Sequence, residues 1–125
     1  MSIKVEIINQ LSDNYSYVIH SIITKEALVV DPSESKPIIN YIKNNHLILK
    51  GLLITHHHTD HTSGIKDLLK FKNVDVYTPN LLIPETTKLI KDKDKIFFDF
   101  VNFLVISTPG HTLDHVVYYN DKEKF

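Results

Sequence analysis

The sequence predicts a single α/β domain. Strand-like segments recur along the chain, two segments with helical periodicity lie between them, and the continuous apolar run at residues 51–54 is typical of a strand buried on both faces. The chain has 125 residues, of which 42% are hydrophobic, so it can bury one sizeable core. It shows no internal repeat and no low-complexity linker, and we expect residues 1–125 to form one unit.

The amino-terminal part of the chain is expected to form three strands, because apolar and polar residues alternate there. These strands are predicted at residues 3–9, 15–23 and 27–30. In the first of them, Ile3, Val5 and Ile7 share one face. His20 and His46 show no pattern that links them to a partner, and both are expected at the surface.

The first helix is predicted over residues 36–46. Asp31-Pro32-Ser33 interrupts the preceding strand, and Ser35 is placed to cap the helix. Pro37 is tolerated in a first helical turn, where its missing N–H has no partner within the helix. Apolar residues then recur on one stripe, which consists of Ile38, Ile39, Tyr41 and Ile42.

The rest of the chain alternates between strands and one further helix. After the buried strand, the predicted elements are a helix over residues 62–71, a strand at 74–77, a hairpin-like pair at 96–100 and 103–107, and a strand at 116–119. The lysine- and aspartate-rich run at residues 91–95 is expected to be a solvated turn. This succession of strands and helices supports the α/β class.

The strongest candidate site directly follows the buried strand, where six residues contain four histidines and one carboxylate. Neutral imidazole and carboxylate are ligands that suit zinc, iron or manganese. In an extended segment residues two apart share a face, so His56 and His58 can bind one ion while the residue between them points away. Asp60 and His61 lie where the next helix is predicted to begin, and they can hold a second ion.

A second strand-ending loop, Thr108-Pro109-Gly110-His111-Thr112, carries one more histidine. Together with the first cluster, it favours a metal-binding role for His111. The chain has no cysteine, so any metal must be held by nitrogen and oxygen ligands. Histidine runs also occur in purification tags and low-complexity metal buffers, but this cluster is internal, non-repetitive and placed between a strand and a helix.

Charge and composition argue against two classes of partner. The formal net charge is −1 and there is no long basic run, so the sequence offers no electrostatic basis for binding nucleic acid. No segment approaches the roughly 20 apolar residues that span a bilayer, and we expect a soluble, cytoplasmic protein without membrane contact. All 14 basic residues are lysines, so anion recognition would rely on lysine or backbone amides. The sequence does not specify the oligomeric state.

The two histidine-bearing motifs resemble those of the metallo-β-lactamase superfamily. They are His56-x-His58-x-Asp60-His61 and, about 50 residues later, residues 108–112. More narrowly, the chain resembles the glyoxalase II family of hydroxyacylglutathione hydrolases, and the resemblance covers nearly all of it. The segments that carry this narrower resemblance are Leu11-Ser12-Asp13-Asn14-Tyr15, Val30-Asp31-Pro32, Thr55-His56-His57-His58 and residues 91–96.

The resemblance implies a fold and a set of metal ligands. The chain would form a partial catalytic domain, the amino-terminal half of an αββα sandwich, without the carboxyl-terminal half and the glutathione-binding helical domain. His56, His58 and His111 would bind one Zn²⁺ ion, and Asp60 and His61 would contribute to a second, with iron or manganese as alternatives. Asp60 would also orient the attacking hydroxide and so be the catalytic residue.

The implied activity is hydrolysis of a small glutathione thioester, S-lactoylglutathione, to glutathione and D-lactate by attack of a metal-bound hydroxide. In this family a downstream aspartate and a further histidine complete the second site. Neither position lies within the 14 residues that follow His111, so we expect the 125-residue chain to bind one ion tightly and to be impaired in turnover. Two alternatives stay open: another superfamily hydrolase that acts on lactones or phosphodiesters, and a non-catalytic protein that binds a single zinc ion.

Overall fold

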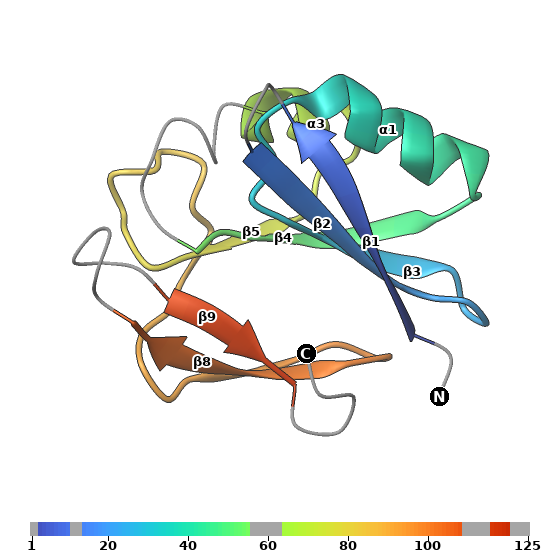
Figure 1. Cartoon of the computed structure of the whole chain (residues 1–125). Helices are drawn as coiled ribbons and strands as arrows, with labels where there is room; N and C mark the ends of the chain where they lie inside the picture. Colours follow the sequence, from blue (N-terminus) through green and yellow to red (C-terminus); the bar gives the residue numbers. More distant parts are fainter. Residues whose placement is uncertain (1–2, 11–13, 56–63, 109–115, 121–125) are drawn as a thin grey trace.

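The computed structural model of the protein describes residues 3–10, 14–55, 64–108 and 116–120. Within these residues the chain forms two stacked β-sheets, and two helices cover the outer face of the larger sheet (Figure 1), which confirms the predicted α/β class. The helices are α1 (Ser35–Asn44) and α3 (Ile65–Phe71). The strands are β1 (Ile3–Gln10), β2 (Asn14–Ser21), β3 (Glu26–Val30), β4 (Ile48–Leu53), β5 (Asp75–Thr78), β6 (Lys88–Leu89), β7 (Lys95–Phe97), β8 (Asn102–Ser107) and β9 (Val116–Tyr119).

The larger sheet has the strand order β1-β2-β3-β4-β5-β6. Its first three strands are antiparallel neighbours, whereas β3, β4, β5 and β6 run parallel to one another. In the chain, α1 lies between β3 and β4, and α3 lies between β4 and β5, as crossover connections require. The carboxyl ends of β3, β4 and β5 therefore meet at one edge. The smaller sheet is antiparallel, with the order β7-β8-β9.

The prediction for the second strand was two residues too long. β2 ends at Ser21, whose hydroxyl oxygen accepts hydrogen bonds from the N–H groups of Ile23 at 3.2 Å and Thr24 at 3.0 Å. A serine side chain that binds nearby backbone in this way offers it an alternative to sheet pairing, so the chain turns. The short strand β6 was not predicted, because two residues are too few to show alternation.

The prediction that Ser35 caps the first helix was also wrong. Ser35 is the first residue of α1, and Glu34 occupies the N-cap position without a side-chain capping hydrogen bond. The Ser35 hydroxyl instead donates to the carboxylate of Asp67 on α3, at 3.4 Å. This contact links the two helices at their amino-terminal ends.

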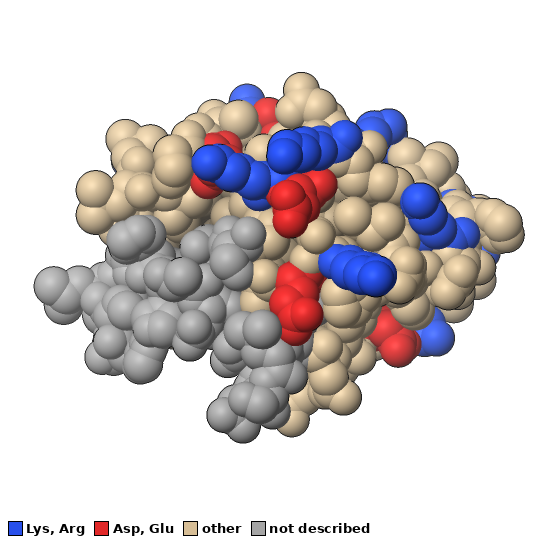
Figure 2. Space-filling view, turned by 90° about the horizontal axis from the view of Figure 1, so that it is seen from above, with Lys and Arg blue, Asp and Glu red and all other residues tan. Residues whose placement is uncertain are grey.

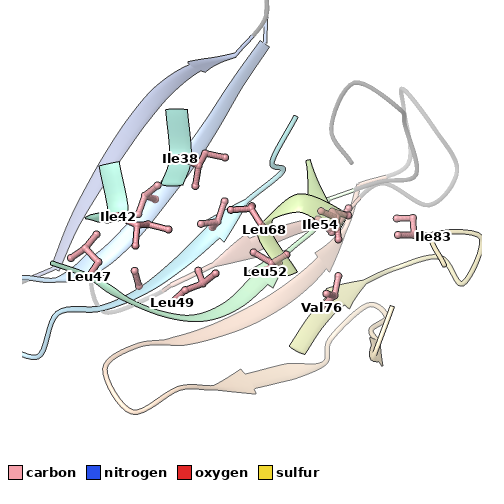
Figure 3. Close-up of a cluster of buried hydrophobic side chains, with 13 residues drawn as sticks. Ile38, Ile42, Leu47, Leu49, Leu52, Ile54, Leu68, Val76 and Ile83 are labelled. Carbon is pink, nitrogen blue, oxygen red and sulfur yellow. The ribbon is translucent and has the colours of Figure 1, made fainter. Parts of the chain in front are cut away.

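Buried apolar side chains form two layers that meet at β4. One layer fills the space between the larger sheet and the helices (Figure 3), where Ile38 and Ile42 of α1 pack in the same cluster as Leu52 of β4. The next residue, Leu53, points into the other layer, between the two sheets. The last three residues of β4 are therefore buried on both faces of the sheet, as the continuous apolar run predicted. One buried cluster of this second layer consists of Ile19, Leu28, Val30, Leu53, Val101 and Phe103. A neighbouring buried cluster consists of Ile90, Ile96, Val105 and Val116.

The predicted apolar face of β1 is only partly covered. Ile3 packs against the layer between the sheets, but Val5 and Ile7 are 39% and 58% exposed. Their partners on β2 are Ile19 and Tyr17, of which Ile19 is buried and Tyr17 is exposed. An apolar strip therefore stays in contact with solvent on this part of the larger sheet.

Charged residues of both signs are interspersed on the helix-covered face of the molecule (Figure 2). The chain carries 14 basic and 15 acidic residues, and this mixing leaves no basic patch on the face in view. Over the part of the chain that the structure describes, no helix has the length and hydropathy needed to cross a membrane.

His20 is buried, contrary to the sequence prediction, with only 5% of its surface exposed. Strand alternation places it on the helix side of β2, where its Nε2 atom lies 2.8 Å from the hydroxyl oxygen of Tyr41 on α1. Burial, and then the positive charges of Lys4 and Lys25, lower the pKa of His20 from its ordinary value of 6.5. His46 is exposed, as predicted.

Replacing Ile42 by alanine should lower the free energy of unfolding by about 2–5 kcal/mol, because it leaves a cavity between α1 and the larger sheet. The matched control is Ile23→Ala, at a side chain that is 76% exposed. The Ile23→Ala substitution should change the free energy of unfolding by less than about 0.5 kcal/mol. Urea unfolding followed by circular dichroism measures both values, and equal costs would contradict this packing.

Stability should fall as the pH is lowered below about 6.5, because the unfolded chain then binds a proton at His20 more readily than the folded chain does. The stability that neutral His20 contributes is fully present above the pKa of this residue in the unfolded chain. It is lost as the pH falls toward the lower pKa that His20 has in the folded chain. His20→Gln should flatten this part of the stability profile, whereas His46→Gln, at an exposed position, should leave it unchanged. Urea midpoints between about pH 5 and pH 8 test this. An unaltered slope in His20→Gln would assign the effect to other groups.

Candidate metal centre

The predicted ligand segment leaves the larger sheet at the edge where the carboxyl ends of the parallel strands meet. Val30 of β3 pairs with Leu53 of β4, and Leu53 pairs with Tyr77 of β5. Beyond β4, the N–H of Ile54 donates to the carbonyl oxygen of Tyr77 at 2.9 Å. Thr55 follows, as the last described residue before the predicted ligands. Open α/β sheets commonly bind ligands at such an edge.

Asp31 holds Thr55 in place from the neighbouring strand. Its carboxylate accepts one hydrogen bond from the Thr55 N–H at 2.8 Å and another from the Thr55 hydroxyl at 2.7 Å. Asp31 is buried, so these are charge-assisted bonds with little competition from water. Its φ of 53° lies in the left-handed region, which aspartate adopts more readily than most residues. A buried carboxylate therefore fixes the backbone directly before His56.

The described chain resumes at Gly64, beside the same turn. The N–H of Gly64 donates to the carbonyl oxygen of Pro32 at 3.2 Å. A Cβ atom at this position would lie 3.2 Å from three backbone atoms of residues 32–35, which is closer than side chains normally approach. Its φ of −86° is ordinary, so glycine is needed here for space and not for conformation. The residues on either side of 56–63 are thus both attached to the turn after β3.

The described residues that flank the second histidine-bearing segment, residues 109–115, are also connected to Thr55. Ser107 at the end of β8 pairs with Val116 at the start of β9, so the described residues on the two sides of this segment lie close together. The N–H of Val116 donates to the carbonyl oxygen of Thr55 at 2.8 Å. This hydrogen bond therefore joins the residue before the first segment, Thr55, to the residue after the second, Val116.

Tyr118 makes a further contact at this place. Its hydroxyl donates to the carbonyl oxygen of Ile54 at 2.5 Å and lies 3.2 Å from that of Tyr77. Burial and, next, the negative charge of Asp31 raise the pKa of the Tyr118 phenol well above its ordinary value of 10, and the hydrogen bond to Ile54 opposes this rise. The hydroxyl therefore keeps its proton and stays a donor at neutral and mildly alkaline pH.

The five predicted ligands lie outside the described residues: His56, His58, Asp60, His61 and His111. Among the residues that are described, no group of three histidine, aspartate or glutamate side chains is arranged to hold an ion. The ligand assignment, and the catalytic role of Asp60, therefore stay predictions. The described residues form a frame that joins the residues flanking the two segments, and the predicted imidazole and carboxylate ligands would come from both segments.

Sequence reasoning missed most of this frame. Thr55 was noted only beside the histidines, and Gly64 and Tyr118 carry no pattern that singles them out. Asp31 was noted only within the Val30-Asp31-Pro32 resemblance. A usable signal did exist for Asp31, because an acidic residue directly after a buried strand lies where α/β sheets place functional groups.

A sequence model of the metallo-beta-lactamase superfamily matches residues 11–125 of the chain. The chain is also similar to proteins named hydroxyacylglutathione hydrolase. That of Pseudoalteromonas translucida is 38% identical over 125 residues, which cover 98% of this chain and 49% of the relative. That of Bdellovibrio bacteriovorus is 35% identical over 124 residues, which cover 97% and 49%. The chain thus spans about half the length of the curated relatives it matches.

Solved structures share the fold at lower sequence identity. The BLEG-1 B3 metallo-beta-lactamase has a TM-score of 0.86 at 23% identity, over 96% of this chain and 68% of that one. The class B3 di-zinc metallo-beta-lactamase LRA-12 from an Alaskan soil metagenome has a TM-score of 0.80 at 18% identity, over 95% and 55%. TTHA1623 in a di-iron-bound form has a TM-score of 0.79 at 19% identity, over 95% and 68%. These likenesses confirm the fold alone.

Asp31→Asn should lower the free energy of unfolding by about 1.5–3 kcal/mol, the range for hydrogen bonds to charged groups. Asparagine keeps the side-chain size and tolerates the positive φ, so the variant mainly removes the negative charge that receives both bonds from Thr55. Thr55→Val, which loses only the hydroxyl bond, should cost less, and Thr55→Ser should cost least. Urea unfolding at neutral pH ranks the three, and a fully stable Thr55→Val would contradict the role of the hydroxyl.

Proposed function

Because the chain belongs to the metallo-beta-lactamase superfamily, we propose that it serves as a metal-dependent thioester hydrolase. Its substrate is S-lactoylglutathione, which is converted to glutathione and D-lactate. The observation that carries this proposal is the hydrogen bond from Val116 to Thr55, because it joins the segments that bear the predicted ligands. The choice of a glutathione thioester rests on the relatives at 35% and 38% identity that are named hydroxyacylglutathione hydrolase.

The proposed metal ligands come from both segments. His56, His58 and His111 would hold one ion, and Asp60 and His61 would contribute to a second. Neutral imidazole and carboxylate suit Zn²⁺, with iron or manganese as alternatives. Proteins of similar fold include one with two zinc ions and one with two iron ions.

The chemistry of a thioester suits such a site. A pair of bound divalent ions supplies a water of lowered pKa and polarises the acyl carbonyl group, so no serine or cysteine nucleophile is required. When the C–S bond breaks, the thiolate that leaves has a parent pKa near roughly 8.5, so its departure needs little help from a general acid. An amide or a phosphodiester has a poorer leaving group and would need more assistance.

The chain's own residues would position the reactants. Asp60 would orient the nucleophilic water toward the carbonyl carbon. Asp31 and Thr55 support this by holding the backbone before His56 in one position, so that less ordering remains to be done when an ion binds. Since all basic residues are lysines, the carboxylates of glutathione would be bound by lysine side chains or backbone amides.

His58→Ala should remove the tightly bound ion, because it deletes one of three proposed ligands. The matched control is His46→Ala, since His46 is exposed and precedes β4, whereas the predicted ligand segment follows the opposite end of that strand. The metal-free 125-residue chain is titrated with zinc, and bound metal is measured after gel filtration. Unchanged metal content in His58→Ala would refute the ligand assignment.

The same samples decide between the candidate activities. Hydrolysis of S-lactoylglutathione is followed beside that of a lactone and a phosphodiester, and we expect measurable but slow turnover of the thioester by the 125-residue chain. Faster turnover of the lactone or the phosphodiester would replace the proposal by another hydrolase of the superfamily. Tight zinc binding without turnover of any of the three would indicate a non-catalytic zinc-binding protein.

A further inference from the structure

We propose that Tyr118 is a positioning residue for the metal centre: its hydroxyl holds β9 against the backbone of Ile54, and so joins the described residues that flank the two segments carrying the predicted ligands. This inference rests on the proposed function, because it concerns the same ions. It goes beyond the ligand set by assigning a role to a residue that contributes no ligand.

The hydroxyl of Tyr118 connects the two sheets at the ligand-bearing edge. Tyr118 belongs to β9 of the smaller sheet, whereas the carbonyl groups that it meets belong to Ile54, directly after β4, and to Tyr77 of β5. The single hydroxyl hydrogen points mainly to Ile54, since that oxygen is at 2.5 Å and the Tyr77 oxygen is at 3.2 Å. The N–H of Ile54 donates to the same Tyr77 carbonyl, so three groups form one local network.

β9 binds two consecutive carbonyl groups of the ligand-bearing strand. Val116 donates through its backbone to the carbonyl oxygen of Thr55, and Tyr118 donates through its side chain to that of Ile54. The first proposed ligand, His56, is the next residue after this pair. On the other side, the segment that contains His111 runs directly into Val116. A displacement of β9 would therefore move Val116, which directly follows the second segment, relative to Thr55, which precedes the first.

The ring of Tyr118 is held independently of its hydroxyl. It packs against the apolar layer between the sheets and meets the ring of Phe103 edge-on, with the ring centres 6.3 Å apart. Phe103 in turn contacts Phe98, and Phe98 contacts Tyr77, in the same edge-on manner. Phenylalanine at position 118 would keep these ring contacts and lose only the hydrogen bonds. Tyr118→Phe therefore separates positioning from packing.

The test compares zinc affinity in the unsubstituted chain, Tyr118→Phe and Tyr41→Phe. Tyr41 is the matched control, because its hydroxyl is also hydrogen-bonded but lies on the helix side, against the His20 side chain. Tyr118→Phe should bind zinc up to about 10-fold more weakly, the lower end of the loss seen when a partner of a metal ligand is removed, because Tyr118 binds the backbone before His56 and not a ligand itself. The visible spectrum of the cobalt-substituted protein should change as well, because it reports the arrangement of ligands. Tyr41→Phe should alter neither.

The outcomes separate this inference from the proposed function. If the unsubstituted chain binds no zinc, the proposed function fails and the inference fails with it. If it binds zinc and Tyr118→Phe gives the same affinity and the same cobalt spectrum, the inference alone is overturned. Phe103→Leu, which disturbs the same apolar layer without touching a hydroxyl, controls for general loosening. An equal loss of zinc affinity in Phe103→Leu and Tyr118→Phe would also overturn the inference.

A second measurement needs no substitution. Zinc binding should slow amide hydrogen exchange at Ile54 and Val116, whose N–H groups donate across the junction. The N–H of Ile48, which bonds to the carbonyl group of Lys25 at the opposite end of β4, should exchange at an unchanged rate. If zinc leaves the exchange of Val116 unaltered, the junction is not coupled to the ion and the inference is overturned.

Discussion

The backbone of Ile54 and Thr55 must find hydrogen-bond partners where β4 leaves the larger sheet, and the candidate site depends on how it does so. Tyr77 accepts the N–H of Ile54, the Asp31 carboxylate accepts that of Thr55, and β9 donates to both carbonyl groups. The partners therefore come from β3, from β5 and from the second sheet. A segment bound from three directions cannot shift without leaving a buried polar group unpaired, at a cost of about 1–3 kcal/mol for each.

This junction is stable because it lies where two apolar layers meet. β4 contributes Leu52 to the layer beneath the helices and Leu53 to the layer between the sheets. Close packing on both faces keeps the end of the strand from moving, since protein interiors are dense and yield little. Gly64 adds a steric condition, because only a residue without Cβ lets α3 begin so close to the turn at residues 32–35. Packing as well as hydrogen bonds therefore fixes the described residues on either side of the predicted ligand segment.

The frame explains how one fold can serve different reactions. Its described parts hold ligand-bearing segments together, and none of these contacts depends on what the substrate is. Structural similarity to β-lactamases at 18–23% identity therefore supports a shared fold and gives no information about the substrate. The proposed preference for a thioester rests instead on the thiolate leaving group and on the names of relatives that are 35% and 38% identical over nearly the whole of this chain.

Periodicity and residue type determined much of this protein from the sequence alone: the α/β class, most strands, the burial of the end of β4 on both faces and the residue types suited to a metal. The tertiary structure decided the rest. It showed that His20 is buried, that β2 ends at Ser21, that Asp31 binds Thr55, and that Tyr118 binds the neighbouring Ile54. The reason is physical. Alternation reports which face of a local element is apolar, whereas hydrogen bonds between residues far apart in the chain depend on the path that brings their strands together.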